Sequence, residues 1–334
     1  MSIALTNALK TTSEKVNSLI NEIIVDGCEP KSLYEASKHL ISAGGKRLRP
    51  FLTLKSCEIV SGGEDLALPV AAAIELLHNF TLIHDDIMDE DTKRRGVPTT
   101  HIVWGTPLAI IAGDLLFAKV YESVIRRTDK TTVSSSNLVK ILDLLTEAAI
   151  TICEGQTWDM LYEKRDIISE KEYFTMINGK TAALLESSTK AGAIVGGGSS
   201  EMVRCLGKFG KYCGLAFQIV DDILGLTSDE KTLGKPVGSD IREGKRTLII
   251  VHFFNQASNE EKAKVLSVLG DKTATWSRIS NAIELIDSRG SIEYSKDYAK
   301  KLINEAKKQL NIFPTSFPKQ LLLDLSDYII SRTY

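Results

Sequence analysis

Apolar residues recur at every third or fourth position along most of this 334-residue chain, and the apolar–polar alternation of strands is scarce. A spacing of three to four residues is that of one face of an α-helix. No proline occurs between Pro107 and Pro236, so no residue in that span removes a helical backbone hydrogen bond. The pattern therefore predicts an all-α protein built from long helices.

The same pattern places individual helices. Apolar residues line one face of residues 3–24, a second helix begins at Pro30 and Lys31, and the glycines at 196–198 make the clearest break. We expect further helices at about 50–61, 69–90, 106–125 and 135–163, and a loop at 91–98. Because no internal repeat or low-complexity linker is present, we expect one continuous helical domain over residues 1–334.

Residues 76–96 combine an apolar helix with a cluster of acids. Asp85, Asp86 and Asp89 form a DDxxD sequence, in which the first and last acids lie one helical turn apart. His78 falls on the same stripe. Like charges at this spacing repel, so we expect a bound cation, and oxygen ligands alone favour Mg²⁺ over Zn²⁺. A solvated acidic surface is the alternative, whereas a calcium loop is excluded because its alternating acids and glycine are missing.

A second acidic pair lies far along the chain. Asp221 and Asp222 follow an apolar run, and Gln218 precedes them by one helical turn, so the amide and the acids share a face. Buried carboxylates need a partner, and the run contains no cation, so a salt bridge to a distant lysine is the alternative to a metal. Lys180 lies within a helical Asn-Gly-Lys-Thr sequence, where a lone lysine is most often a solvated surface residue.

Cationic stretches accompany the acids. Paired glycines and three cations occupy residues 44–49, three cations occupy residues 93–95, and a later loop carries Lys235 and Lys245. Such groups bind phosphate well, although the glycine spacing is not that of a nucleotide P-loop and a basic surface turn is the alternative for the first stretch. Separate cationic sets suggest two phosphorylated ligands, and metal-bound acids would suit a reaction in which a diphosphate leaves.

The composition is that of an ordinary soluble globular protein, with 43% hydrophobic and 25% charged residues. A net charge of −2 gives no support for nucleic-acid binding. The five cysteines show no metal-binding spacing and suit reduced thiols in a cytosol. The chain has no signal-peptide pattern and no run of eighteen apolar residues, so we expect a cytoplasmic protein without stable membrane insertion.

The motifs occur in an order that resembles the trans-isoprenyl diphosphate synthases. The segments that carry the resemblance are GGKRLRP, DDIMD followed by RRG, GKT, FQIVDD and GKPVGSD, and they are most similar to the archaeal geranylgeranyl diphosphate synthases. The resemblance covers roughly Leu33 to Leu248. It implies a helical bundle around a deep central cavity, usually in a homodimer. It also implies condensation of isopentenyl diphosphate with dimethylallyl, geranyl or farnesyl diphosphate to geranylgeranyl diphosphate, which has 20 carbons, with two or three Mg²⁺ ions per subunit.

The resemblance also implies roles for single residues. Asp85 and Asp89 would bind the Mg²⁺ that holds the allylic diphosphate, and Asp221 would bind a further Mg²⁺. The side chains that would bind isopentenyl diphosphate are Lys46, Arg49, His78 and Arg95. Those that would bind the allylic substrate are Arg94, Lys180, Thr181, Gln218, Lys235 and Lys245. Among the latter, Thr181 and Gln218 would also offer dipoles near the allylic cation.

Two positions bear on how the family's pattern applies to this chain. Gly225 stands where many relatives have a third aspartate, so Asp221 alone, Asp229 or a water molecule would complete that metal site. Phe80, five residues before Asp85, stands where a bulky ring often forms the cavity floor, which favours arrest at 20 carbons. A plain core aromatic is the alternative for Phe80.

Several other functions remain alternatives. A farnesyl product or a longer product of 25 to 30 carbons requires only one or two changed side chains in the cavity wall. A terpene synthase, which is a lyase, shares the first acidic motif, but its second motif normally mixes Asn, Ser and Glu, which FQIVDD does not. A non-catalytic partner subunit usually loses one acidic motif, whereas both are present here.

Overall fold

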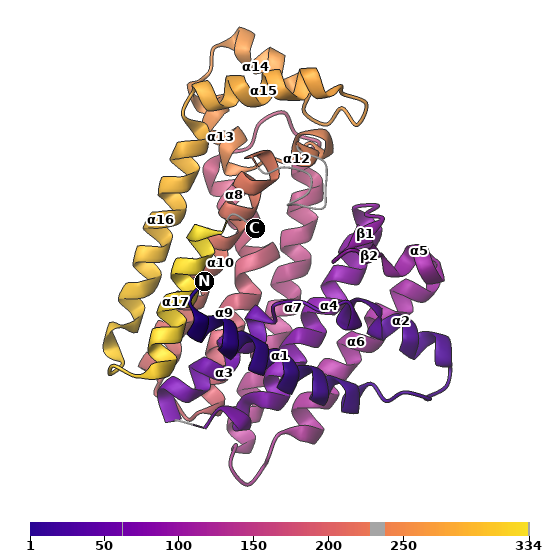
Figure 1. The fold of residues 1–334 in the computed structure, drawn as a ribbon, viewed down its shortest axis with the longest axis vertical. Helices are drawn as coiled ribbons and strands as arrows, with labels where there is room; N and C mark the ends of the chain where they lie inside the picture. The colour runs from indigo at the N-terminus through magenta and orange to yellow at the C-terminus, as the bar shows by residue number, and fades with distance from the viewer. Residues whose placement is uncertain (62, 228–237, 333–334) are drawn as a thin grey trace. The chain divides into compact units, whose positions relative to one another are not determined.

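The prediction of an all-α protein is confirmed. The computed structural model describes residues 1–61, 63–227 and 238–332, and most of them are helical (Figure 1). The strands within these ranges are β1 (Lys93–Arg94) and β2 (Val97–Pro98), which form an antiparallel pair with Arg94 opposite Val97.

Contacts between Cα atoms divide the chain into two compact units, each assembled from segments distant in sequence. The first unit comprises Met1–Ala149, Ser187–Gly207 and Leu310–Asp324. The second unit comprises Ile150–Glu186, Lys208–Gln309 and Leu325–Tyr334. The single domain over residues 1–334 and its central cavity remain predictions.

The first unit is built around the apolar helix α4 (Leu68–Met88), which packs against α6 (Thr106–Arg127). The close approach requires Gly113 of α6, because a Cβ atom there would lie 2.3 Å from His84 Nε2. The elements that begin in this unit also include α1 (Ile3–Ile23), α2 (Lys31–Ser42), α3 (Leu48–Ser61), the 3₁₀ turn η1 (Glu64–Ala67), α5 (Thr100–Trp104) and the 3₁₀ turn η3 (Leu310–Ile312). Three helices begin here and continue into the second unit, namely α7 (Ser135–Glu163), α10 (Ser200–Thr227) and α17 (Phe317–Ser331).

One described helical stretch, Asp65–Met88, is long and apolar enough to cross a membrane by length and composition alone. Of its most apolar window, 61% is buried inside the protein. The core helix of a helical unit has the same properties, because its side chains face other helices on most sides.

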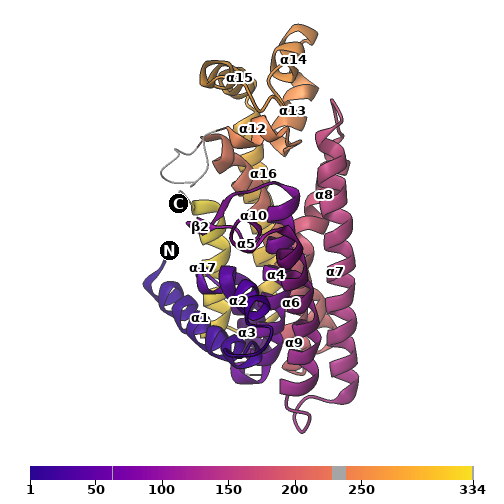
Figure 2. The same cartoon turned by 90° about the vertical axis from the view of Figure 1, so that its right-hand side faces the viewer.

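The second unit contains α8 (Glu170–Ile177), a π-helical turn (Asn178–Ala182) and most of α10 (Ser200–Thr227). The start of α9 (Ala183–Val195) also lies in this unit. The remaining helices are α12 (Ser239–Glu243), α13 (Leu248–Gln256), α14 (Asn259–Leu266), α15 (Trp276–Ser288) and α16 (Ser291–Gln309). Helix α13 packs on α16, and α14 and α15 lie side by side in both views (Figures 1 and 2).

The helix boundaries agree with the predicted ones to within about two residues, and α9 and α10 are separated at the predicted break, residues 196–199. The expected loop at 91–98 is instead a β-hairpin. Its two central residues, Arg95 and Gly96, have φ angles of 53° and 79°. Positive φ at both central positions is the geometry of a type I′ turn, which matches the twist of paired strands.

Candidate functional site

A buried carboxylate organises the cations of the first unit. Glu75, on α4, is 2% exposed, and its Oε1 atom accepts a hydrogen bond from Arg47 Nη1 at 2.7 Å. Asn79 Nδ2 donates to the same oxygen at 3.0 Å, and Arg95 Nη2 lies 4.0 Å from it. An ion pair this deeply buried is stable only when its remaining donors are also satisfied, and Arg47 Nη2 donates to the Ile41 carbonyl at 2.7 Å. Arg47 is therefore structural, and Glu75 and Asn79 hold the neighbouring guanidinium of Arg95.

His78 and Arg49 lie together beside this cluster, since Arg49 Nη1 and His78 Nε2 are 3.2 Å apart. Burial, followed by the charges of Arg49 and Arg95, lowers the pKa of His78 well below its usual value. The imidazole is therefore neutral at pH 7, and its Nε2 accepts the hydrogen bond from the guanidinium. Lys46 is exposed. Three of the four predicted isopentenyl diphosphate ligands, Arg49, His78 and Arg95, thus lie near one another.

The three acids of the DDxxD segment have different surroundings. Asp86 is fully buried and forms an ion pair with Arg94, which also donates to Asp91 Oδ2 at 3.2 Å. Burial raises the pKa of Asp86 to about 6, although Arg94 opposes the shift. Asp85 is half-buried, and Asp89 is exposed at the C-terminal end of α4. Arg94 is thus occupied by acids of its own segment, and its predicted role toward the allylic substrate stays a prediction.

The donor chemistry of this segment fits a hard divalent ion. Asp85 and Asp89 offer only carboxylate oxygens, the ligands that Mg²⁺ prefers. Asp86 Oδ2 is buried and has no hydrogen-bond partner among the described residues. Within residues 1–61, 63–227 and 238–332, no three His, Cys, Asp or Glu side chains are grouped so that they could hold a metal ion together.

Phe80 lies between two aromatic rings at the interface of α4 and α6. The centroid of its ring is 5.1 Å from that of Phe117 on α6 and 4.7 Å from that of His84 on α4. Phe117 in turn contacts Tyr121 with its ring centroid at 5.4 Å. The ring of Phe80 is therefore held in place by its neighbours rather than free to turn away.

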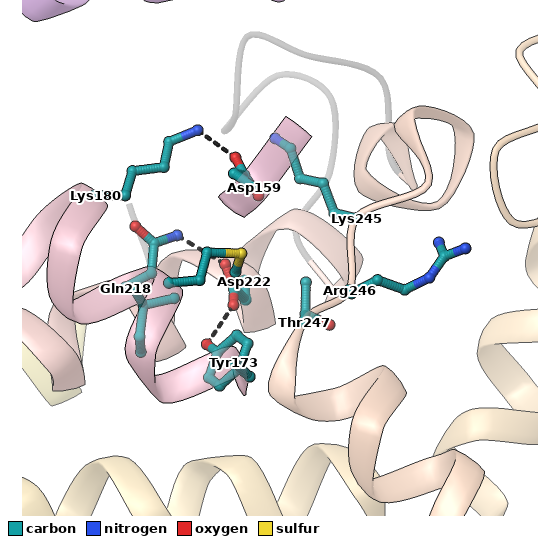
Figure 3. Close-up of a pocket in the computed structure, with 10 residues that line it drawn as sticks. Asp159, Tyr173, Lys180, Gln218, Asp222, Lys245, Arg246 and Thr247 are labelled. Atoms are coloured by element: carbon teal, nitrogen blue, oxygen red, sulfur yellow. Dashed lines mark hydrogen bonds and ion pairs between the residues drawn. The ribbon is translucent and has the colours of Figure 1, made fainter. Parts of the chain in front are cut away.

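In the second unit, four of the predicted residues are brought together around a cavity of about 90 Å³ (Figure 3). Lys180, Gln218 and Lys245 line it, and Thr181 is hydrogen-bonded to Gln218. The other lining residues include Asp159, Tyr173, Asp222 and Arg246. Lys235, also predicted to bind the allylic diphosphate, lies outside the described residues.

A continuous hydrogen-bond chain runs through this cavity wall. Thr181 Oγ1 donates to Gln218 Oε1 at 2.6 Å, and Gln218 Nε2 donates to Asp222 Oδ1 at 2.8 Å. The hydroxyl of the fully buried Tyr173 donates to Asp222 Oδ2 at 2.7 Å. Burial raises the pKa of Asp222 to about 7. Tyr173 was not predicted from the sequence, because it precedes Asp222 by 49 residues and no local pattern connects the two.

The amine of Lys180 lies 2.5 Å from Asp159 Oδ2, so this lysine is not simply a solvated surface residue. It sits on the π-helical turn, a geometry that occurs frequently at functional sites. The backbone of this turn packs directly against the backbone of α7 at Gly155. A Cβ atom on Gly155 would lie only 2.2 Å from the Lys180 backbone nitrogen. This paired approach of Gly155 and Gly179 was also not predicted.

Asp221 is paired with the C-terminal arginine. Arg332 Nη2 donates to Asp221 Oδ1 at 2.8 Å, and its guanidinium lies 3.9 Å from the ring centroid of Phe217. The side chain of Arg332 is 3% exposed, and that of Asp221 is 30% exposed. Arg332 is thus paired with a predicted metal ligand.

Gly225 has a steric explanation in this structure. A Cβ atom at Gly225 would lie 2.5 Å from Asp240 Oδ2. A carboxylate from α12 thus occupies the space that a side chain at Gly225 would need. Asp240 in turn lies 3.4 Å from the amine of Lys245, which also pairs with Glu243 at 2.8 Å.

Comparison with known proteins agrees with the helical fold. The sequence profile described as polyprenyl synthetase matches residues 30–286. The chain is 44% identical to the geranylgeranyl diphosphate synthase of Sulfolobus acidocaldarius, over 96% of this chain and 97% of that protein. It is 40% identical to the geranylfarnesyl diphosphate synthase of Aeropyrum pernix, over 94% of this chain and 99% of that one.

Among solved structures, the geranylgeranyl pyrophosphate synthetase of Pyrococcus horikoshii is similar with a TM-score of 0.93 and 43% identity, over 98% of both chains. The fold and the motifs thus define an all-α protein of the isoprenoid synthase type. The chain belongs to the polyprenyl synthetase family.

Proposed function

We propose that this chain is a prenyltransferase that condenses isopentenyl diphosphate with an allylic diphosphate and makes geranylgeranyl diphosphate. The observation that carries the proposal is its 44% identity over nearly the whole chain to a protein named for that product. We also propose that the protein is located in the cytoplasm and forms a homodimer.

In the first unit, Asp85 and Asp89 would hold a Mg²⁺ for the allylic diphosphate. Lys46, Arg49, His78 and Arg95 bind isopentenyl diphosphate. The hydrogen bond between neutral His78 and Arg49 supports this assignment, since it leaves the guanidinium charged and oriented for a phosphate oxygen. Glu75 keeps Arg95 in place.

In the second unit, Asp221 would hold a further Mg²⁺, and Lys180 and Lys245 would bind the allylic diphosphate. Lys235 and Arg94 are assigned to the same substrate. Thr181 and Gln218 turn their dipoles toward the allylic cation. Their mutual hydrogen bond of 2.6 Å supports a fixed orientation of both groups. Neither side chain carries a full negative charge, which would trap the cation as a covalent adduct.

The reaction breaks the carbon–oxygen bond of the allylic diphosphate, joins the allylic carbon to the double bond of isopentenyl diphosphate and releases one proton. When bound, Mg²⁺ neutralises the charge that develops on the departing diphosphate. Lysine and arginine neutralise the rest. The proton leaves with the departing diphosphate, so no separate side-chain base is assigned.

Phe80 is assigned to the floor of the product cavity, which stops growth at 20 carbons. Its ring is held by Phe117 and His84. A product of 25 carbons is the second candidate, because the geranylfarnesyl diphosphate synthase of Aeropyrum pernix is 40% identical to this chain.

The test is a product-length assay with labelled isopentenyl diphosphate and each allylic starter, with and without Mg²⁺. We expect a 20-carbon diphosphate that forms only with the metal. Asp85→Ala is expected to lower turnover by at least about a hundredfold, the order of loss for one charge-stabilising group. The control is Asp26→Ala, which removes an acid that is 92% exposed. Retained turnover in Asp85→Ala would contradict the metal assignment, and hydrocarbon released from geranylgeranyl diphosphate alone would indicate a terpene synthase.

A further inference from the structure

The amide of Gln218 lies between the Asp222 carboxylate and the Thr181 hydroxyl, which can donate or accept a hydrogen bond. Its nitrogen faces Asp222 Oδ1 at 2.8 Å, and its oxygen accepts from the Thr181 hydroxyl at 2.6 Å (Figure 3 shows the nitrogen directed toward Asp222). The two ends of an amide have nearly the same shape, so hydrogen-bond partners decide which end points where. A carboxylate oxygen that accepts a hydrogen bond requires the NH₂ end.

Tyr173 and Gln218 contact different oxygens of the Asp222 carboxylate. The buried Tyr173 hydroxyl donates to Asp222 Oδ2 at 2.7 Å and satisfies that oxygen. Asp222 is 6% exposed, so its other oxygen also needs a donor from the protein. The only group that the described hydrogen bonds place there is Gln218 Nε2. The two elements involved, α8 and α10, both belong to the second unit in this region.

We propose that Asp222, held by Tyr173, is a positioning residue that sets the polarity of the Gln218 amide. The carbonyl oxygen of Gln218, rather than its NH₂ group, is thereby presented to the cavity. This inference rests on the proposed prenyl transfer, because a carbonyl oxygen stabilises an adjacent carbocation and an NH₂ group repels it. Because the amide dipole is already oriented, no free energy is spent on reorienting it when the positive charge develops.

Two conservative variants distinguish the orientation of the Gln218 amide from the mere loss of a hydrogen bond to Asp222. Asp222→Asn keeps the shape, but the new NH₂ group can donate to Gln218 Oε1, so Gln218 is free to turn over. Tyr173→Phe removes one donor and leaves Asp222 to accept from Gln218, so the polarity is kept. We expect kcat to fall about a hundredfold in Asp222→Asn, with KM for both diphosphates changed by less than about threefold. In Tyr173→Phe we expect kcat to fall less than about tenfold.

A binding measurement tests the same point without turnover. The probes are an allylic diphosphate analogue with an ammonium nitrogen in place of the reacting carbon and an uncharged thioether of the same shape. The native protein is expected to bind the ammonium analogue more tightly than the thioether, and Asp222→Asn is expected to reduce that preference at least about tenfold. This binding preference can be measured without catalysis. If the native protein forms no prenyl product, the proposed function is refuted, and the effect of Asp222→Asn on the binding preference still tests the role of Asp222.

The inference would be overturned by any of three results: an unchanged kcat and binding preference in Asp222→Asn, an equal loss of kcat in Tyr173→Phe, or recovery of the lost kcat when Mg²⁺ is raised. Thermal unfolding of both variants within a few degrees of the native protein would confirm that the comparison concerns folded molecules.

Discussion

At the scale of single residues, Phe80 has the most direct expected effect on the product. Its ring packs on Phe117, with the centroids 5.1 Å apart. Replacing Phe80 with alanine removes the ring and opens space between α4 and α6, so we predict that products of 25 carbons or longer become the main fraction. Because Phe80 is only half-buried, the loss of stability is expected to stay at or below about 3 kcal/mol.

Chromatography of the dephosphorylated products measures this change. The matched control is Phe174→Ala, which removes another half-buried ring, one that lies 4.8 Å from the ring of Tyr298 in the second unit. The control is expected to leave product length unchanged. If Phe80→Ala still makes a 20-carbon product, the assignment of Phe80 to the cavity floor is wrong.

The two acidic motifs show how far residue types alone predict a site. The sequence marks both pairs of adjacent aspartates, but it does not show which member of each pair faces inward. The structure buries Asp86 and Asp222 and leaves Asp85 and Asp221 partly accessible. Adjacent helical residues point about 100° apart, and the choice depends on partners distant in sequence, such as Tyr173, which no local pattern predicts.

At the scale of elements, Gly155 is expected to control the segment that carries Lys180 and Thr181. A methyl group at Gly155 would lie 2.2 Å from the Lys180 nitrogen and 2.8 Å from the Gly179 Cα atom. Backbone atoms cannot turn aside as a side chain can, so Gly155→Ala must displace the π-helical turn. We predict a loss of kcat of at least about tenfold and a destabilisation of about 1–3 kcal/mol.

The control is Gly207→Ala on α10, where the new methyl group would meet the Lys190 side chain, with its Cε atom 2.4 Å away. A flexible lysine can move, so this variant should keep native activity and stability. Initial rates and thermal denaturation measure both variants. Native activity in Gly155→Ala would show that the position of the turn does not matter.

Helices were predicted more reliably than their local distortions. The boundaries of α1, α6 and α7 follow from apolar spacing and from glycine and proline, which act locally. The π-helical turn has no such signal, because its residues fit an ordinary helix and it packs against Gly155, which is distant in sequence. The hairpin at 93–98 was missed for a related reason, since Arg95 adopts a positive φ that non-glycine residues rarely take.

At the scale of the whole molecule, the sequence showed no linker, yet the contacts separate two units whose segments alternate along the chain. Such an arrangement has no signature in composition, because helices α7 and α10 each continue from one unit into the other without a break in their periodicity. The fold class was therefore predictable, whereas the grouping of its helices depended on contacts between distant residues.

The proposed homodimer leads to the last prediction. Helices α5 and α6 carry large apolar side chains on their exposed side, namely Ile102, Val103, Ile110, Ile111 and Ile125. Exposed apolar side chains on neighbouring helices are candidates for a protein interface. Ile110 and Ile111 are 42% and 51% exposed, and placing aspartates there would bury unpaired charges in a dimer, at a cost of several kcal/mol.

We therefore predict that Ile110→Asp combined with Ile111→Asp halves the mass of the native particle in light scattering after gel filtration. Ile3→Asp is the control, because Ile3 is 81% exposed and begins α1, where an acid is favourable. It should leave the mass unchanged. A native protein with the mass of one chain would contradict the dimer itself, while a double variant that keeps twice that mass would show that the subunits meet through a different face.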